Sequence, residues 1–326
     1  MTSLIDTLLN DIANDTAISD ERRELLRELL ARVVAVADSP AHTRDLHVAV
    51  QAIDELLEAF ALFEAQGDRP KITIFGSART PADAPVYQMT IDLARAMAER
   101  GWVIVSGAGP GIMEASARGA GEANTVGINI RLPFEQRANE YIAATNLVTM
   151  KYFFTRKVAL TRPSIAFVVM PGGLGTMDEL FEVLTLLDTG KTNPAPVVLL
   201  DTPDGDFWHE WMTFIDRGIV KNHYVATDDM FLVRLATSID ETVDEIEHFY
   251  SNYRGFEIVG ERGLISLRHE PTDAQIAALA RNVPCFDDPP GYKREDATTI
   301  SFNFDGRSYA NLRLVINEVN NWIDQD

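Results

Sequence analysis

The sequence predicts an α/β protein built on a doubly wound parallel sheet of the Rossmann type. Three observations lead to this fold class. From Lys71 to about residue 250, short β-rich runs alternate with helical stretches, which is typical of parallel strands joined by crossover helices. Three of the strands end in glycine-rich loops, and the loops after strands are where open α/β sheets bind ligands. An amphipathic helical segment precedes this region, and a mixed segment follows it.

We expect three parts: a helical extension over 1–68, a Rossmann-like domain over 69–254, and a small α+β appendage over 255–326. In the extension, apolar residues recur at helical spacing before and after a break at Ser39 and Pro40. This pattern predicts a helical hairpin, which could cover one flank of the core domain or a partner subunit.

The elements of the other two parts are read from apolar periodicity and from glycines at helix ends. In the Rossmann-like domain, strands are predicted at 71–75, 102–106, 126–130, 165–170 and 196–200, and helices at 86–100, 111–123, 150–160, 175–187, 207–216 and 241–250. In the appendage, strands are predicted at 264–268 and 299–304, and helices at 272–281 and 309–323.

The charge balance limits the partners of the protein. It has 326 residues, with 49 Asp and Glu against 29 Lys and Arg and a net charge of −20. Such a surface repels DNA, RNA and anionic membranes, so we expect neither a nucleic-acid nor a membrane partner. The single cysteine, Cys285, excludes an intrachain disulfide. Because the first residues carry acids where a signal peptide is basic, we expect a cytoplasmic location.

The three glycine-rich loops form the candidate binding site. They contribute Gly76 and Ser77 after the first strand, Gly107, Gly109 and Gly111 after the second, and Gly172, Gly173, Gly175 and Thr176 in the string PGGLGT. Each loop passes into a predicted helix, whose amino-terminal N–H groups and dipole attract phosphate. One such loop is often only a tight turn, but three in one sheet favour a phosphate-bearing ligand.

Two common nucleotide motifs are absent. A dinucleotide fingerprint needs GxGxxG after the first strand, where this chain has GSARTP, and the second loop, GAGPG, has the wrong spacing. No lysine follows a glycine loop as the P-loop requires. NAD and an ATPase mechanism are therefore disfavoured.

Acidic and basic side chains beside these loops are the candidates for chemistry. Glu179 follows PGGLGT by about one helical turn, and Glu114 begins the helix after the second loop. The segment MKYFFTRKVAL adds Met150, Arg156 and Lys157 next to aromatic residues, where a base could stack and a guanidinium could reach phosphate or ribose. The alternatives are an ordinary amphipathic helix and an acid that merely favours a first helical turn.

Other chemistries find little support. The six histidines form no HExxH pair, GxSxG is absent, and nothing around the lysines marks a pyridoxal phosphate site. We therefore expect no metal and no cofactor.

The strings GAGPGIMEA (107–115), FFTRK (153–157) and PGGLGTMDELFEVLTLLDTGK (171–191), in this order, resemble the Lonely Guy family, whose members are often mislabelled as lysine decarboxylases. The resemblance covers roughly residues 70–250, and the longer chain is similar to the type II form. Ala108 stands where the family commonly has the middle glycine of a triplet.

The resemblance implies a phosphoribohydrolase that splits the N-glycosidic bond of nucleoside 5′-monophosphates, namely cytokinin riboside monophosphates or AMP. It places the catalytic pair on Arg156 and Glu179, the phosphate loop on residues 172–176, and the sites near the subunit boundary of a homodimer. The competing interpretations are a module that binds a nucleotide without cleaving it and an amino-acid decarboxylase. The preferred base stays open.

Overall fold

The computed structural model describes residues 7, 19–37, 39–133, 137–286 and 291–323. The chain forms two compact units, Met1–Asp54 and Glu55–Asp326. The expectation of a cytoplasmic location was based on the first residues of the sequence, and most of these lie outside the described residues. Within the described ranges, every helix is too short or too polar to cross a membrane.

Two helices form the described part of the amino-terminal region, α2 (Asp20–Ala37) and α3 (Thr43–Glu64). They lie on either side of the predicted break at Ser39 and Pro40. The second unit includes the end of α3 from Glu55 onward. Apolar side chains of both helices, including Leu25 and Val50, are exposed in this chain.

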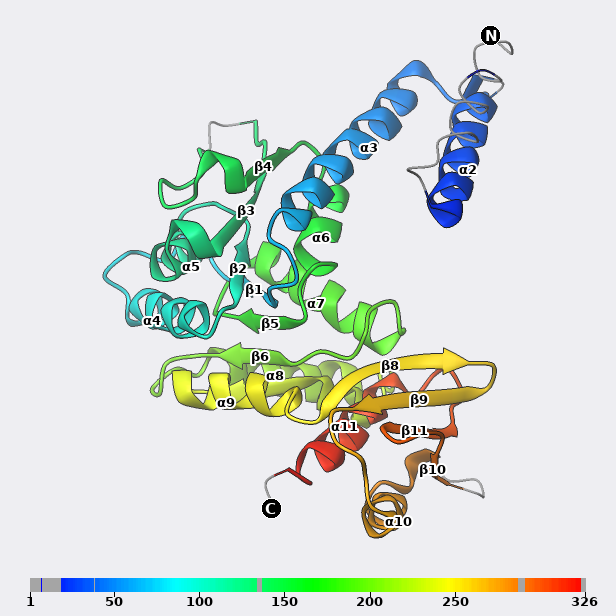
Figure 1. The fold of residues 1–326 in the computed structure, drawn as a ribbon. Helices are drawn as coiled ribbons and strands as arrows, with labels where there is room; N and C mark the ends of the chain where they lie inside the picture. The colour runs from blue at the N-terminus through cyan, green and yellow to red at the C-terminus, as the bar shows by residue number, and fades with distance from the viewer. Residues whose placement is uncertain (1–6, 8–18, 38, 134–136, 287–290, 324–326) are drawn as a thin grey trace. The chain divides into compact units, whose positions relative to one another are not determined.

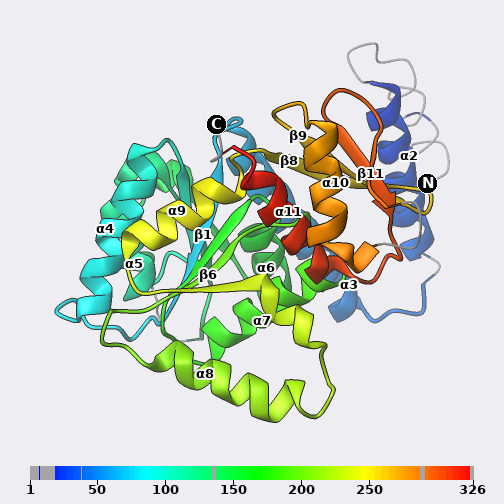
Figure 2. The ribbon, with the colours of Figure 1, turned by 90° about the horizontal axis from the view of Figure 1, so that it is seen from below.

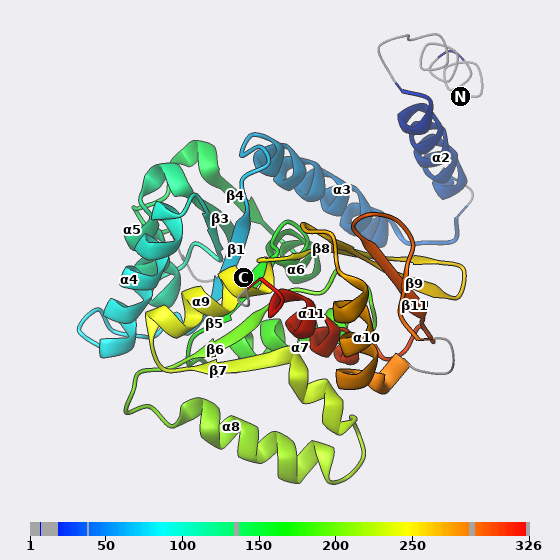
Figure 3. The same ribbon diagram turned by 60° about the horizontal axis from the view of Figure 1, so that its bottom comes forward.

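The second unit is organised by a seven-stranded parallel sheet in the order β4-β3-β2-β1-β5-β6-β7. Figure 1 labels the strands from β1 to β6, and Figure 3 adds β7. Its strands are β1 (Lys71–Phe75), β2 (Val103–Ser106), β3 (Thr125–Ile130), β4 (Leu147–Met150), β5 (Ala166–Val169), β6 (Val197–Leu200) and β7 (Val233–Ala236). Every neighbouring pair is parallel, and the strand order reverses between β1 and β5. The predicted doubly wound parallel sheet is therefore confirmed.

Helices cover both faces of this sheet (Figure 2). On one face lie α4 (Pro85–Glu99), α5 (Ile112–Ala120) and α9 (Ile239–Phe249), and on the other α6 (Phe153–Thr161), α7 (Leu174–Asp188) and α8 (Phe207–Ile215). Alternate residues of a strand pack on opposite faces of the sheet. Ile104 packs in the core with α4, α5 and α9, whereas Val103 and Val105 pack in the core with α6, α7 and α8. This alternation is what a strand buried on both faces requires.

A smaller antiparallel sheet follows, in the order β10-β11-β9-β8. Its elements are β8 (Tyr253–Val259), β9 (Arg262–Leu267), β10 (Lys293–Arg294) and β11 (Thr299–Asn303), with helices α10 (Asp273–Asn282) and α11 (Leu312–Asn320). The two helices and the sheet, seen together in Figure 3, share a core that includes Leu267, Leu279 and Ile316. Across the whole second unit, short helical turns connect the strands and helices of both sheets, at Glu122–Asn124, Ala144–Asn146, Asp216–Val220, Thr227–Leu232, Pro284–Phe286 and Tyr309–Asn311.

The largest departures from the predicted elements are at strands on the edges of the sheets. Met150 ends β4, whereas the sequence predicted that it begins a helix, and the helix starts at Phe153. The edge strands β7, β8 and β10 were not predicted either. These edge strands are partly exposed, and β7 and β10 are also short, so they lack the continuous apolar run that marks a strand buried on both faces.

Candidate active site

Three glycine-rich loops meet where the strand order of the large sheet reverses. They leave β1, β2 and β5, which are neighbours in the sheet. The Ser77 N–H donates to the Pro171 carbonyl (3.3 Å), and the Ile112 N–H donates to the Ser77 carbonyl (3.0 Å). Backbone hydrogen bonds therefore join the first loop to both of the others, at the position where α/β sheets bind ligands.

The second loop approaches its neighbours too closely for larger residues. A Cβ atom on Gly107 would lie 2.0 Å from an Arg156 guanidinium nitrogen, and one on Gly111 would lie 2.4 Å from the Ser77 carbonyl oxygen. Ala108 has φ of +59°, in the left-handed region that favours glycine. Asn139 braces the loop, because its side-chain amide donates to the Gly109 carbonyl (3.1 Å) and its N–H donates to the Ala108 carbonyl (2.9 Å).

The third loop passes directly into α7. Gly173 is the N-cap residue of this helix, and no side chain caps its amino terminus, so the amides of the first turn are left for solvent or a ligand. Gly173 and Gly175 are exposed, with open space where their side chains would be. Thr176 is buried, and its side chain packs against Gly172. This terminus can hold an anion.

Arg156 of α6 and Glu179 of α7 face each other beside these loops. Their nearest charged atoms, Arg156 Nη1 and Glu179 Oε1, are 3.7 Å apart, which is an ion pair but is too long for a hydrogen bond. The side chains are only 10% and 17% exposed. Arg156 is anchored elsewhere, since its Nε donates to the Ile128 carbonyl (2.9 Å) and its Nη2 to the Gly107 carbonyl (3.3 Å).

Burial shifts the pKa of both partners. The pKa of Glu179 is raised from 4.5 to about 7, mainly because desolvation disfavours the carboxylate, while the charge of Arg156 partly opposes the shift. Desolvation also lowers the pKa of Arg156, and the Glu179 carboxylate partly restores it. A carboxyl group with a pKa near neutrality is suited to exchanging protons at physiological pH.

The other predicted residues differ in their accessibility. Glu114 is half-buried and accepts a hydrogen bond from the Tyr87 hydroxyl (2.7 Å); burial and this bond raise the pKa of Tyr87 to about 12. Lys157 joins α6 to α7 through Asp178 (2.8 Å) and Glu182 (2.5 Å). The Met150 side chain is fully buried in the core beneath α6, α7 and α8.

Asn129, near the carboxyl end of β3, is a further buried polar residue beside the site, and no sequence motif marks it. Its side chain is 5% exposed, and its Oδ1 atom has no hydrogen-bond partner among the residues that the structure describes. The preceding residue, Ile128, supplies the carbonyl that holds Arg156. A polar side chain inside the apolar run VGINI was the signal that could have revealed it.

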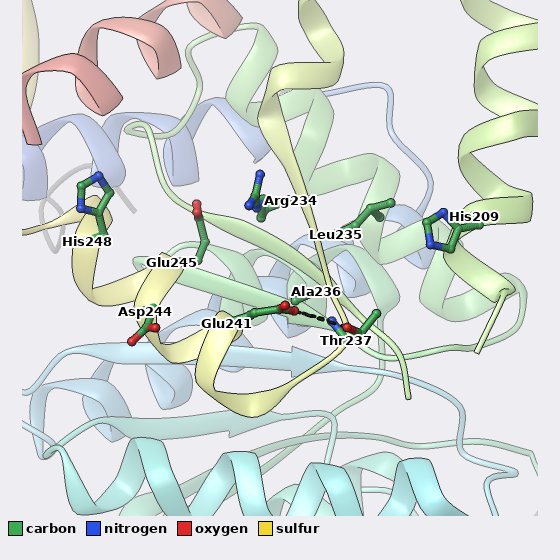
Figure 4. A pocket seen from close by; sticks show the side chains of 9 residues that line it. All are labelled: His209, Arg234, Leu235, Ala236, Thr237, Glu241, Asp244, Glu245 and His248. Carbon is green, nitrogen blue, oxygen red and sulfur yellow. Dashed lines mark hydrogen bonds between the residues drawn. The ribbon is translucent and has the colours of Figure 1, made fainter. Parts of the chain in front are cut away.

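A separate cavity of about 500 Å³ lies beside the edge strand β7, two strands away from β5 (Figure 4). The Glu241 carboxylate accepts a hydrogen bond from the Thr237 N–H (2.9 Å), and Glu245 pairs with Arg313 of α11. None of the predicted site residues lines this cavity. Within the described ranges, no three His, Cys, Asp or Glu side chains form a group that could hold a metal ion.

Comparisons with known proteins agree with the motifs. A family model described as "Possible lysine decarboxylase" matches residues 113–246. The chain is 32% identical over 159 residues to the cytokinin riboside 5′-monophosphate phosphoribohydrolase of Mycobacterium tuberculosis. This alignment covers 47% of the chain and 81% of the relative. It is 30% identical over 164 residues to a "Probable cytokinin riboside 5′-monophosphate phosphoribohydrolase" of Oryza sativa subsp. japonica, covering 49% and 74%.

Among solved structures, the molybdenum cofactor binding protein of Rippkaea orientalis is 20% identical, with 56% of this chain and 97% of that one covered and a TM-score of 0.39. The two sequence relatives are the informative matches, because each is aligned over more than two thirds of its own length. With the motifs on one sheet edge, they show that this chain belongs to the Lonely Guy family, the family of the cytokinin riboside 5′-monophosphate phosphoribohydrolases.

Proposed function

We propose that this chain hydrolyses the N-glycosidic bond of nucleoside 5′-monophosphates and releases the free base and ribose 5-phosphate. The observation that carries the proposal is the buried Arg156–Glu179 pair beside an uncapped helix terminus. The sequence relatives are named for the same reaction, which supports the proposal.

Phosphate binding is assigned to residues 172–176. The amides of the first turn of α7 supply donors, and the open space at Gly173 and Gly175 lets a phosphate approach the backbone. The loop that carries Gly76 and Ser77 borders this position, since it is hydrogen-bonded to Pro171. Binding energy from the phosphate, remote from the scissile bond, can be used to position C1′ of the ribose.

The bond-breaking step is assigned to Glu179 and Arg156. As the bond between C1′ and the base nitrogen breaks, the bonding electrons leave with the base and C1′ develops oxocarbenium character. The Glu179 carboxylate stabilises this charge and accepts a proton from the water whose oxygen bonds to C1′. The departing base gains a proton from solvent. The planar guanidinium of Arg156 holds phosphate or ribose oxygens and keeps the nucleotide aligned.

The decisive experiment is an assay of free base released from a panel of nucleotides. We expect the purified chain to release adenine from AMP, or an isoprenylated adenine from the corresponding monophosphate, and to act far more weakly on the matching nucleosides. Nucleotide binding without release of any base would favour a sensing module instead. Equal turnover of AMP and adenosine would contradict the role of residues 172–176.

Further expectations from the sequence belong to the same proposal. We assign the activity to residues 69–254, with 1–68 as a helical extension and 255–326 as an appendage. Exposed apolar side chains on α2 and α3 support a homo-oligomer, because such surfaces commonly mark interfaces; light scattering in solution tests this. The single cysteine fits the reducing conditions of the cytoplasm, the proposed location.

A further inference from the structure

The amino terminus of α6, the helix that carries Arg156, is held by a side chain from another helix. Tyr152 is the N-cap residue of α6 and provides no side-chain cap. Glu55 of α3 binds on either side of this N-cap position instead, without accepting from a backbone N–H of the first turn. Its Oε1 accepts a hydrogen bond from the Lys151 N–H (2.7 Å), and its Oε2 accepts one from the Thr155 hydroxyl (2.5 Å). Both carboxylate oxygens are therefore bound to the segment that begins α6.

Glu55 is a buried acid, only 2% exposed, and it has no ion pair within the part of the chain that the structure describes. Burying a carboxylate is costly unless hydrogen bonds and local dipoles compensate. Here the two donors and the positive end of the α6 dipole do so. The burial of Glu55 is therefore compensated by its contacts with the start of α6.

This first turn sets the position of Arg156. Thr155 is the residue directly before Arg156, and its hydroxyl also lies within hydrogen-bond distance of the Tyr152 carbonyl (2.9 Å). The Arg156 N–H donates to that same carbonyl (3.2 Å). Glu55 therefore restrains the turn from which the guanidinium extends toward Ile128, Gly107 and Glu179.

Apolar packing and specific contacts both join α3 to α6. A cavity of about 380 Å³ lies between the ends of these helices, lined in part by Phe60, Phe63 and Val158. At the carboxyl end of α6, the Arg162 guanidinium lies 5.1 Å from the centre of the Phe60 ring. Ala59 and Leu62 of α3 pack in one buried cluster with Ala159 and Leu160 of α6. The contacts of Glu55 and Arg162 add directional restraints at the two ends of α6 to this packing, which is itself non-directional.

We propose that Glu55 is a positioning residue of the active site: by holding the first turn of α6, it sets the orientation in which Arg156 meets Glu179 and the nucleotide. The kinetic part of this inference rests on the proposed function. The structural part does not, since it concerns only the position of Arg156 in the free protein.

The experiment compares Glu55→Ala with Glu55→Gln and with Glu58→Ala, which removes an exposed acid one turn along the same helix. Glu55→Ala leaves the Lys151 N–H and the Thr155 hydroxyl without their acceptor, whereas glutamine keeps one acceptor oxygen. We expect Glu55→Ala to lower kcat for AMP by about 10- to 100-fold with a smaller change in KM, and glutamine to restore kcat to within roughly fivefold of the original chain. Glu58→Ala should leave both constants unchanged.

A second measurement needs no catalysis. Phenylglyoxal modifies accessible arginines, and peptide mass spectrometry separates Arg156, which is 8% exposed, from Arg162, which is exposed at the end of the same helix. The modification rate of Arg156 divided by that of Arg162 should rise about tenfold in Glu55→Ala, since a loosened first turn releases the Arg156 guanidinium. In Glu55→Gln and Glu58→Ala this ratio should stay near its value in the original chain.

The outcomes separate the two proposals. If the original chain releases no base from any nucleotide, the proposed function fails, and the modification ratio alone still decides the role of Glu55. If Glu55→Ala lowers stability but leaves kcat per folded molecule and the modification ratio unchanged, Glu55 is not a positioning residue. Should Glu55→Ala fail to fold, Thr155→Val replaces it, with Thr155→Ser as its rescue, and the same two readouts apply.

Discussion

The carboxyl edge of the large sheet and the C-terminal appendage bury polar side chains in opposite ways. In the appendage, the side chain of Asn320 on α11 accepts hydrogen bonds from the backbone N–H groups of Asn252 (3.0 Å) and Tyr253 (2.9 Å) and donates to the Phe249 carbonyl (2.7 Å). The Asn252 amide donates in turn to the Val319 carbonyl (2.9 Å). At the sheet edge, Glu179 and Arg156 are charged groups without a hydrogen bond between them.

The difference separates what stabilises the fold from what performs chemistry. A neutral amide with its donors and acceptors satisfied locks α11 to the start of β8 at no electrostatic cost. A buried carboxyl group with a pKa near 7 destabilises the fold progressively as pH rises from about 4.5 through 7, because the unfolded chain ionises this group more readily than the folded chain does. Such a group is found where function requires it. Variants at the sheet edge should therefore mainly change the rate of base release, and variants in the appendage should mainly change the free energy of unfolding.

The largest effect is expected from Glu179→Gln, which keeps the size of the side chain and removes its charge. If the carboxylate stabilises C1′ and accepts a proton from water, release of adenine from AMP should fall by roughly 10³- to 10⁴-fold, or about 4 to 5.5 kcal/mol. Binding of AMP, measured by calorimetry, should change little because the amides of residues 172–176 are untouched. A variant that keeps the original rate would remove Glu179 from the mechanism.

The matching test in the appendage is Asn320→Ala. It leaves two buried N–H groups and one buried carbonyl without partners, so urea unfolding should show a loss of about 3 to 4 kcal/mol. Asn321→Ala, at the exposed next position, serves as the control. Activity per folded molecule should be retained, since the network does not touch the glycine loops. A stability loss below roughly 1 kcal/mol would show that water satisfies these groups and that the network is not a lock.

A third test uses pH to expose the cost of Glu179. Because its folded pKa of about 7 lies above the ordinary 4.5, the folded state holds this proton more tightly than the unfolded state. Its contribution to stability is therefore present below about pH 4.5 and is lost as pH rises through 7, by roughly 3 kcal/mol. The unfolding free energy of Glu179→Gln minus that of the original chain should rise across this range. A flat difference would mean that the carboxyl group is not desolvated.

The activity should follow the opposite course over the same range. Because the ionised form of Glu179 is the working form, kcat/KM for AMP should increase with pH up to about 7 and then level off. Activity and stability are thus expected to depend on one titration with opposite signs.

Central elements were the most predictable part of the fold. Residues 71–75 were predicted as a strand and form β1, because the short run KITIF is rich in β-branched and aromatic residues and is bounded by turn residues. The edge strand β7, with the sequence VRLA, carries an arginine and is only partly buried. Its identity as a strand depends on pairing with β6, and that is a tertiary contact with no local signal.

The candidate site was predictable only where motifs mark it. The strings around Arg156 and Glu179 pointed to both residues, but their separation of 3.7 Å depends on how α6 and α7 pack. Glu55 lies 100 residues before its partner Thr155 and belongs to no motif, so its role could be inferred only from the contacts. Residues that act through others have no pattern of their own in a single sequence.

The smallest effect is expected at Ala108, inside the second glycine loop. Its φ of +59° strains a residue that has a Cβ atom, and glycine would relieve roughly 1 kcal/mol of this strain. The methyl group is fully buried against the position of Gly127, and losing its contacts offsets most of the gain, by roughly 0.8 kcal/mol. Ala108→Gly should therefore change the unfolding free energy by less than about 0.5 kcal/mol in either direction, and adenine release should stay within roughly twofold of the original rate. A loss of activity beyond tenfold would instead mean that the methyl group holds this loop in the shape that receives the nucleotide, and that strain at the sheet edge, like the buried charge of Glu179, is retained for function.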